Sequence, residues 1–525
     1  MSIPFFHRFR GYLETAPAMW AAQRLLDGTP ELGAIHLAHA LLRQALALTP
    51  FDPDLAGLVT SLGAQLNIPN SRPDMAGPGM TQAQSTLDNV TPHALPKLLD
   101  EEIPPLVRHL ALASLWSNGE DGDLFIKHVR RLCMKDPDNP GLPLLAWGAH
   151  ALGETSLALE MIRSASTFLG EALKARLAMA AGDHVQARLN IINSLTLEPA
   201  QPHLIERLAQ LERQSRPLPA TDSARVHILF YTFNKLDTTL ATLQSLLASD
   251  IGAARITLMN NGSTFFGPDE FSAGVTRIAQ GRDVEVIHLP VNIGAPAARN
   301  WLYRLPRTQE ADFVAFLDDD VLLPQNWLRL YLQDFVDYPE ICAVGPKGLN
   351  PNPFRTIQYV YRYFQEVGEH RIRFTSNSPM FFDLGQFDGQ RPCLSVMGCC
   401  HMFDRRKLER LGVPDFDLRF TPSQVDDLER DIQIWKHGGQ VLYDGRVEVV
   451  HMQDAGRAAP KSEAAWGHVW GNHLKMEAKF SGRELREIHE LVLSAEKIHW
   501  QNCLTITQDQ LPIHVYNFWK QCDQI

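Results

Sequence analysis

Three adjacent carboxylates, Asp318, Asp319 and Asp320, are the residues of this chain best suited to chemistry. They follow a mostly apolar run of strand length at 312–317 and precede a turn-forming sequence at 321–324. Because adjacent like charges repel, this acidic triplet needs a counter-ion, and carboxylate oxygens suit Mg²⁺ or Mn²⁺. An isolated triplet would be read more simply as an exposed acidic loop. The carboxyl end of a strand is, however, where open α/β sheets bind ligands, so we predict a metal site here.

Composition narrows the class of protein. The chain has 525 residues, a net charge of −11 and 45% hydrophobic residues, which is typical of a soluble globular protein and argues against a general nucleic-acid binder. No apolar run approaches the roughly 20 residues that span a bilayer, and the N-terminus lacks a signal-peptide pattern. The seven cysteines include no pair with metal-binding CxxC spacing. We therefore expect free thiols and a cytoplasmic location.

The first part of the chain, residues 1–215, has the apolar periodicity of helices throughout. A helix ending at a proline recurs at Pro50 and Pro199, with a looser echo at Pro137. The intervals are irregular, and the pattern predicts an all-α domain of degenerate, tetratricopeptide-like repeats. Many prolines and glycines at 69–96 predict a flexible loop, and the segment 216–224 reads as a linker.

Beyond the linker, strands alternate with helices. Apolar strands are expected at 226–232, 255–259, 284–289 and 312–317. Such alternation predicts a parallel sheet with helices on both faces. Polar residues cluster after each strand, where a ligand crevice would lie. We place this α/β domain at 225–480 and a helical C-terminal extension at 481–525.

A series of short motifs follows these strands. In chain order they are Thr232-Phe233-Asn234, Asn260-Asn261-Gly262-Ser263, Asn292-Ile293-Gly294-Ala295-Pro296, the acidic triplet, Asp426-Asp427 and His451. The series resembles family 2 glycosyltransferases over about 225–455. The resemblance implies the GT-A fold, with the acidic triplet as its DXD motif. It also implies an inverting transfer of the hexosyltransferase type, from a nucleotide-sugar to a glycan or protein acceptor. The resemblance favours a UDP-sugar as the donor and Mn or Mg as the cofactor.

The resemblance also assigns residues to the donor site. It implies contacts with the nucleotide-sugar for Thr232, Asn234, Asn260, Asn292, Arg299, Asp318 and Asp319. It implies a metal held by Asp318, Asp320 and His451. Where the family often has an aspartate that contacts the base, this chain has Asn260, which both donates and accepts hydrogen bonds.

The start of the helix that Pro296 opens is a candidate phosphate site. Free N–H groups there would face a pyrophosphate, with Arg299 one turn further on as a cation. An ordinary helix cap is the alternative explanation.

The catalytic base is expected in the acidic pair Asp426-Asp427, which aligns with the start of the family's last helix. We assign the role to Asp427, which would take a proton from the attacking hydroxyl group. Acidic residues are also favoured at a helix start by the helix dipole, and that alternative accounts for Asp426 and Glu429.

Aromatic residues gather at 350–393, and they suit either an acceptor-binding wall or a local core. Two other functions compete with glycosyl transfer. A nucleotidyltransferase of related topology would need a basic, glycine-rich turn after the first strand, and Phe233-Asn234-Lys235 does not supply one. A catalytically weak scaffold would bind protein partners through its helical repeats.

Overall fold

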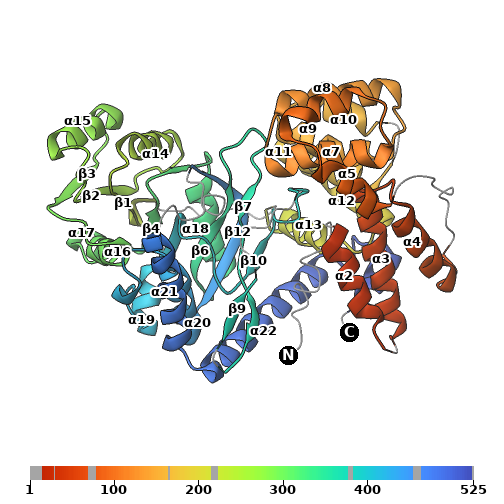
Figure 1. Ribbon diagram of the computed structural model, residues 1–525. Coiled ribbons are helices and arrows are strands. Elements are labelled where there is room, and N and C mark those ends of the chain that lie inside the picture. The colour runs from red at the N-terminus through yellow and green to blue at the C-terminus, as the bar shows by residue number, and fades with distance from the viewer. Residues whose placement is uncertain are drawn as a thin grey trace.

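The computed structural model describes residues 15–28, 30–68, 79–163, 166–214, 223–369, 371–375, 382–452 and 463–522. A helical region at the N-terminus is followed by a large sheet flanked by helices, and Figure 1 shows the two parts side by side. The predicted order of an all-α region and an α/β domain is confirmed.

The N-terminal region contains only helices among its described residues. They are α2 (Thr15–Leu26), α3 (Leu32–Leu48), α4 (Pro53–Gln65), α5 (Met80–Asp88), η1 (Pro92–Ala94), α6 (Leu95–Asp100), α7 (Pro105–Asn118), α8 (Gly122–Lys135), α9 (Leu142–Ala151), α10 (Thr155–Met161), α11 (Phe168–Ala180), α12 (His184–Leu197) and α13 (Pro202–Gln214). Consecutive helices pack in pairs, α2 on α3, α9 on α10 and α11 on α12. The tetratricopeptide-like nature of these pairs stays a prediction.

Part of the predicted loop at 69–96 is helical, and most of the predicted linker at 216–224 lies outside the described residues. Within 69–96, the residues from Met80 to Asp88 form helix α5 rather than a loop, because Ala83 packs with Leu106 and Val107 in a small apolar cluster. Residues 69–78 and most of the predicted linker, 215–222, lie outside the described residues.

The α/β domain is built on one ten-stranded mixed sheet. Its strands are β1 (Val226–Thr232), β2 (Arg255–Asn261), β3 (Glu285–Leu289), β4 (Phe313–Leu317), β5 (Val321–Leu322), β6 (Ile341–Leu349), β7 (Ile357–Tyr359), β10 (Gln390–Pro392), β11 (Cys400–Asp404) and β12 (Gln440–His451). The main path runs β10-β12-β6-β11-β4-β1-β2-β3, with β5 beside β12 and β7 beside β6. Strands β4, β1, β2 and β3 are parallel, as predicted, and β11 enters antiparallel between β4 and β6.

Helices cover both faces of this sheet. The helices are α14 (Leu236–Ala248), α15 (Pro268–Ala279), α16 (Ala295–Tyr303), α17 (Pro306–Gln309), α18 (Trp327–Asp337), α19 (Arg405–Leu411), α20 (Asp426–Lys436), α21 (Glu463–Lys479), α22 (Gly482–Thr507) and α23 (Ile513–Cys522), with short turns η2 (Ser223–Arg225) and η3 (Leu418–Phe420) and a small hairpin of β8 (Phe364–Val367) and β9 (Ile372–Phe374). One core contains side chains of α14, α15 and α18, and the other those of α16, α19, α20 and α22. No described helix is long and apolar enough to cross a membrane.

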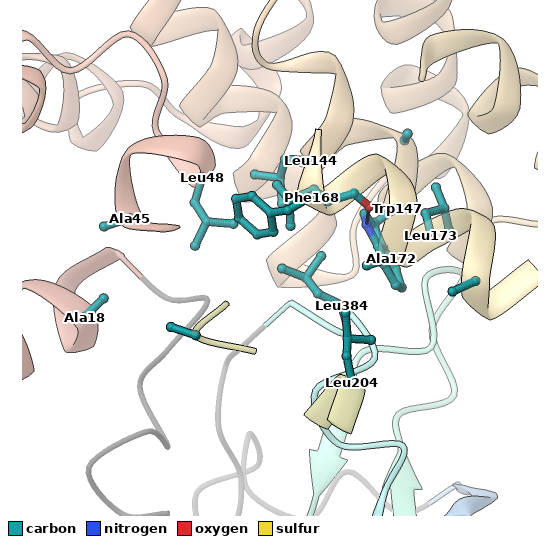
Figure 2. Close-up of a cluster of buried hydrophobic side chains, with 14 of the residues drawn as sticks. Ala18, Ala45, Leu48, Leu144, Trp147, Phe168, Ala172, Leu173, Leu204 and Leu384 are labelled. Carbon is teal, nitrogen blue, oxygen red and sulfur yellow. Dashed lines mark hydrogen bonds between the residues drawn. The ribbon is translucent and has the colours of Figure 1, made fainter. Parts of the chain in front are cut away.

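The helical region and the sheet domain share one apolar cluster. Leu384, from the segment before β10, lies among Trp147 and Leu204 of the helical region (Figure 2). Phe354 meets Phe125 edge to face at 5.3 Å between ring centroids. The C-terminal extension joins the same cluster, because Trp500, Val515 and Trp519 are buried in it. The helical region is therefore joined to the sheet domain by a shared apolar cluster, while the two faces of the sheet keep cores of their own.

The aromatic residues of 350–393 are mostly packing residues. Tyr361 and Tyr363 are buried and meet edge to face at 5.5 Å between ring centroids, and Phe364 is buried beside Phe374. For these side chains the local-core interpretation is correct and the acceptor wall is wrong. Phe381 lies outside the described residues.

Candidate active site

The sheet topology brings the acidic triplet and His451 together. The triplet directly follows β4 and leads into β5, which pairs with the end of β12 so that His451 lies opposite Val321. The Met452 amide also donates to the main-chain oxygen of Asp320 at 2.7 Å. Residues more than 130 positions apart thus meet because two strand ends pair.

Three side chains converge there with atoms suited to a cation. Asp318, Asp320 and His451 each offer one ligand atom, and these atoms all lie within 4.8 Å of one another. His451 Nε2 lies 3.0 Å from Asp320 Oδ1 and 3.9 Å from Asp318 Oδ2. Asp320 and His451 are buried, whereas Asp318 is partly exposed. Two carboxylates and one imidazole form a ligand set that fits Mn²⁺ or Mg²⁺.

The contact of His451 Nδ1 with Gln358 favours the tautomer that leaves Nε2 for a metal. Its Nδ1 lies 2.7 Å from Gln358 Oε1, and Gln358 Nε2 donates to the main-chain oxygen of His451 at 3.2 Å. This pairing assigns the Gln358 oxygen as acceptor and Nδ1–H as donor. In the neutral ring Nε2 then carries a lone pair that faces a carboxylate oxygen, and a bound cation would lie between these two acceptors.

A lysine holds the other side of the triplet. Lys235 Nζ donates to Asp320 Oδ2 at 2.7 Å and to Asp319 Oδ1 at 3.3 Å. Burial raises the pKa of Asp319 to about 6, while Lys235 and Thr232 oppose that rise. Asp320 therefore turns one oxygen to Lys235 and the other to His451.

Arg299 links the triplet to the acidic pair. Its guanidinium is buried, pairs with Asp426, and lies 3.4 Å from Asp318 Oδ1. Burial raises the pKa of Asp426, and Arg299 opposes it. The guanidinium also lies over the rings of Tyr231 and Phe416. Asp426 is thereby engaged in a buried ion pair.

Asp427 is the more accessible member of the pair. Helix α20 begins at Asp426, as predicted for the acidic pair, and Asp427 is only partly buried. Its Oδ2 accepts from the Gly398 amide at 3.1 Å, and its Oδ1 from the Leu428 amide at 2.8 Å. The Asp318 amide donates to the carbonyl of Cys399, next to Gly398, so Asp427 and the triplet flank the same loop.

Three asparagines of the predicted donor site shape the loops after the strands. Asn234, with φ of 60°, accepts from the amides of Thr264 and Phe265. Asn260 is buried and accepts from the Ser263 amide at 3.0 Å. These bonds join the loops after β1 and β2.

The third asparagine, Asn292, joins the loops after β2 and β3. Its Oδ1 accepts from Asn261 Nδ2 at 3.0 Å and from the Gly294 amide at 2.8 Å. Gly262 lies against this loop, since a Cβ on it would lie 2.2 Å from the carbonyl carbon of Val291. Side chains at these positions thus hold the crevice in shape.

The predicted phosphate site at the start of α16 is not open. The Gly294 amide is bonded to Asn292, and the Ala295 amide donates to the Pro422 carbonyl at 2.7 Å. Arg299 points to Asp318 and Asp426 rather than to this helix start. The expectation of free N–H groups at these two positions is therefore wrong, because Asn292 takes the Gly294 amide and a later loop takes the Ala295 amide.

A second acidic cluster is already neutralised by protein cations. Asp383, Asp388 and Glu448 lie close enough to hold an ion. Lys347 Nζ, however, lies 2.5 to 3.0 Å from an oxygen of each, and Arg176 of α11 contacts all three at 3.0 to 3.2 Å. This cluster joins the helical region to the sheet and has no place for a metal.

Two contacts at the site were not predicted. Lys235 had been noted only as part of a turn, and Gln358 had no assigned role. The sequence contains a partial signal for Lys235, since a cation three positions after β1 would lie at the sheet edge that carries the triplet. Gln358 has none, because its place depends on the pairing of β7 with β6.

Comparison with known proteins supports the class of this domain. Residues 228–412 match the family model for Glycosyl transferase family 2. The matched segment contains the acidic triplet and strands β1 to β6 of the sheet, so this part of the chain is similar to family 2 glycosyltransferases. In two strains of Mycobacterium tuberculosis (CDC 1551 / Oshkosh and ATCC 25618 / H37Rv), the pre-mycofactocin glycosyltransferase is 43% identical over 65 residues. That stretch is 12% of this chain and 13% of the relative.

Two solved structures are similar at low identity. The mannosyltransferase PcManGT from Pyrobaculum calidifontis, in complex with GDP-Man and Mn²⁺, is 16% identical with a TM-score of 0.34, over 67% of this chain and 91% of the other. GalNAc-T7 with UDP, GalNAc and Mn²⁺ is 14% identical with a TM-score of 0.39, over 57% and 54%.

Proposed function

We propose that this chain is a divalent-cation-dependent, inverting glycosyltransferase that moves a sugar from a nucleotide-sugar to a glycan or protein acceptor. One observation carries the proposal: Asp318, Asp320 and His451 converge at the edge where four parallel strands end. A structural role alone gives no reason to place two carboxylates beside a lone-pair-bearing imidazole, so the site favours an enzyme over a scaffold.

Each side chain has a part in this reaction. Asp318, Asp320 and His451 would hold Mn²⁺ or Mg²⁺, which stabilises negative charge on the departing nucleoside diphosphate. Thr232, Asn234, Asn260 and Asn292 would shape the donor crevice. A UDP-sugar is the first donor to test, and the cytoplasm is the compartment we propose.

Asp427 is our proposed general base. It is partly exposed, whereas Asp426 is buried in its ion pair with Arg299. A carboxylate that faces a partly dry crevice takes the proton of an acceptor hydroxyl group as that oxygen attacks the sugar. Arg299 would hold Asp426 and Asp318 in place and offset part of the negative charge between them.

The helical region supports the catalytic domain in this proposal. Two roles are open for residues 1–215: recruitment of a protein acceptor, or bracing of the catalytic domain. The buried contacts of Arg176 with three carboxylates of the sheet domain support bracing. A second buried pair, Glu206 of α13 with Arg391 of β10 at 2.8 Å, supports it as well.

A panel of nucleotide-sugars tests the activity. We expect hydrolysis of one donor that stops with EDTA and returns with Mn²⁺ or Mg²⁺, and a thermal shift by the matching nucleoside diphosphate only with the metal. Asp320→Ala should lose both responses. Asp250→Ala, which changes an exposed aspartate outside the site, is the matched control and should keep them. Metal-independent turnover in the wild type would contradict the proposal.

A further inference from the structure

The chain enters the acidic pair through a strained turn. Gln424 and Val425, the two residues before Asp426, have φ of 82° and 73°. Residues with a Cβ rarely adopt this left-handed conformation, and a β-branched residue such as Val425 adopts it least. Such backbone persists only where its surroundings hold it.

One buried side chain contacts three carbonyls of this turn. Asn472 of α21 is 1% exposed, and its Nδ2 lies 3.0 Å from the Phe420 oxygen, 2.7 Å from that of Ser423 and 3.3 Å from that of Gln424. An amide group has two hydrogens to donate, so these three acceptors share them. An aspartate in its place would present a second acceptor and repel the carbonyls.

Two lysines on the same face of α21 extend this contact. Lys475 Nζ donates to the Arg419 carbonyl at 2.7 Å and to Asn472 Oδ1 at 2.9 Å. Lys479 pairs with Asp417 at 2.6 Å and with Glu429 of α20. The spacing of three and four residues places all three side chains on one side of the helix. The turn and the first part of α20 are thus both held by α21.

We propose that Asn472 is a positioning residue that fixes the acidic pair for catalysis by holding the turn at 420–425. The inference rests on the proposed function, since it takes Asp427 as the base. Asp427 reaches the Gly398 amide only while α20 starts at Asp426. If the turn relaxes, the first turn of α20 frays and Asp427 moves off its place. Nucleotide binding changes less than catalysis, because the bonds of Asn234 and Asn260 lie in the loops after β1 and β2 rather than in this turn.

Asn472→Asp tests this role in the full chain. We expect the kcat for hydrolysis of the UDP-sugar that the wild type accepts to fall about 10- to 100-fold, the effect of misplacing a reacting group by about 1 Å. The donor KM and the UDP affinity, measured by calorimetry with Mn²⁺, should stay within about twofold of wild type. Amide hydrogen exchange at 418–430 should become faster. Lys475→Met changes an exposed residue. It should also lower kcat and speed up amide exchange at 418–430, but by smaller factors than Asn472→Asp.

Gln44→Glu is the matched control. Gln44 is a buried amide of α3 that donates to the Ala200 carbonyl at 2.6 Å, far from this turn in the chain. The Gln44→Glu variant should lose thermal stability, but its kcat and its amide exchange at 418–430 should stay as in the wild type. Unchanged kcat and exchange in Asn472→Asp, or an equal kcat loss in Gln44→Glu, would overturn the inference. If the wild type hydrolyses no donor, the proposed function fails, and hydrogen exchange still decides whether Asn472 holds the turn.

Discussion

Removing Arg176 probes how the helical region is fastened to the catalytic domain. This arginine of α11 bonds Asp383, Asp388 and Glu448, and Lys347 is the second cation among them. In Arg176→Met three carboxylates keep one cation. Lys347 is fully buried and the Arg176 side chain is 22% exposed, so water compensates this loss only in part.

The expected size of the effect follows from that burial. Breaking a buried ion pair on one side costs about 3–5 kcal/mol, and the partial exposure of Arg176 favours the lower end, about 3 kcal/mol. An unfolding entropy of about 2.1 cal/mol/K per residue amounts to about 1.1 kcal/mol/K for a chain of this length. The Tm should therefore fall by about 3 °C at pH 7.5.

The pH dependence gives a second readout. Burial raises the pKa of Asp383, but Lys347 and Arg176 outweigh it and hold the pKa well below its usual range. A depressed folded-state pKa adds stability above the ordinary pKa of about 4, and this is lost as pH falls. Without Arg176 the Asp383 pKa rises, and protonation then relieves the excess negative charge. The difference in Tm between variant and wild type should thus shrink as pH falls through the raised Asp383 pKa of the variant.

Arg130→Met is the control for this experiment, because Arg130 pairs with Glu154 on the surface of the helical region, with both side chains about half exposed. Such pairs contribute about 0–1 kcal/mol. Differential scanning fluorimetry over a series from pH 7.5 down to pH 3 measures both variants. A Tm of Arg176→Met equal to that of Arg130→Met at pH 7.5, or a deficit that shrinks nowhere in this series, would refute the role assigned to the ionic cluster.

Three further predictions concern the site and the domain boundary. Asp320→Ala should abolish turnover and the metal requirement with the fold intact, and near wild-type turnover with Mn²⁺ present would show that Asp320 is no ligand. Asp427→Asn should lower kcat by about 10²–10⁴-fold and keep nucleotide affinity. An equal loss of donor affinity by calorimetry would place Asp427 in the donor site. Full activity of Asp427→Asn together with an inactive Asp426→Asn would assign the role of base to Asp426. A chain that begins near residue 221 should be insoluble, because it lacks the partners of Leu384 and Arg391; a soluble form that hydrolyses donor at the wild-type rate would disprove bracing.

The sequence predicted the parts of the site that follow directly from strand ends. The apolar runs before Asp318 and His451 end at one edge of the sheet, so these side chains were expected there, and the structure places them together. Asp426 begins α20, as expected from the acidic residues that a helix start favours. Residues that act across the sheet were not predictable in this way, because the place of Gln358 depends on the pairing of β7.

The helix that opens near Pro296 shows the limit of local reasoning. A glycine, a proline and free amides are the usual signs of an anion site, and the helix is where the pattern predicts it. The closing contact comes from Pro422, more than 120 residues later, whose carbonyl takes the Ala295 amide. No pattern around Pro296 indicates which distant loop will return to it.

The boundary between helical and α/β regions is clear in sequence but not in packing. Helix α22 contacts α20 and β10 in one part and α13 in the other, and α23 returns to α3 and α12. The last segment of the chain thus ties the sheet domain back to the first helices. A partner bound by those helices would be held at a fixed distance from Asp427, without a flexible tether. If the helical region recruits an acceptor, it must therefore present that acceptor to Asp427 in a fixed position. Such recruitment requires that the helices also brace the catalytic domain.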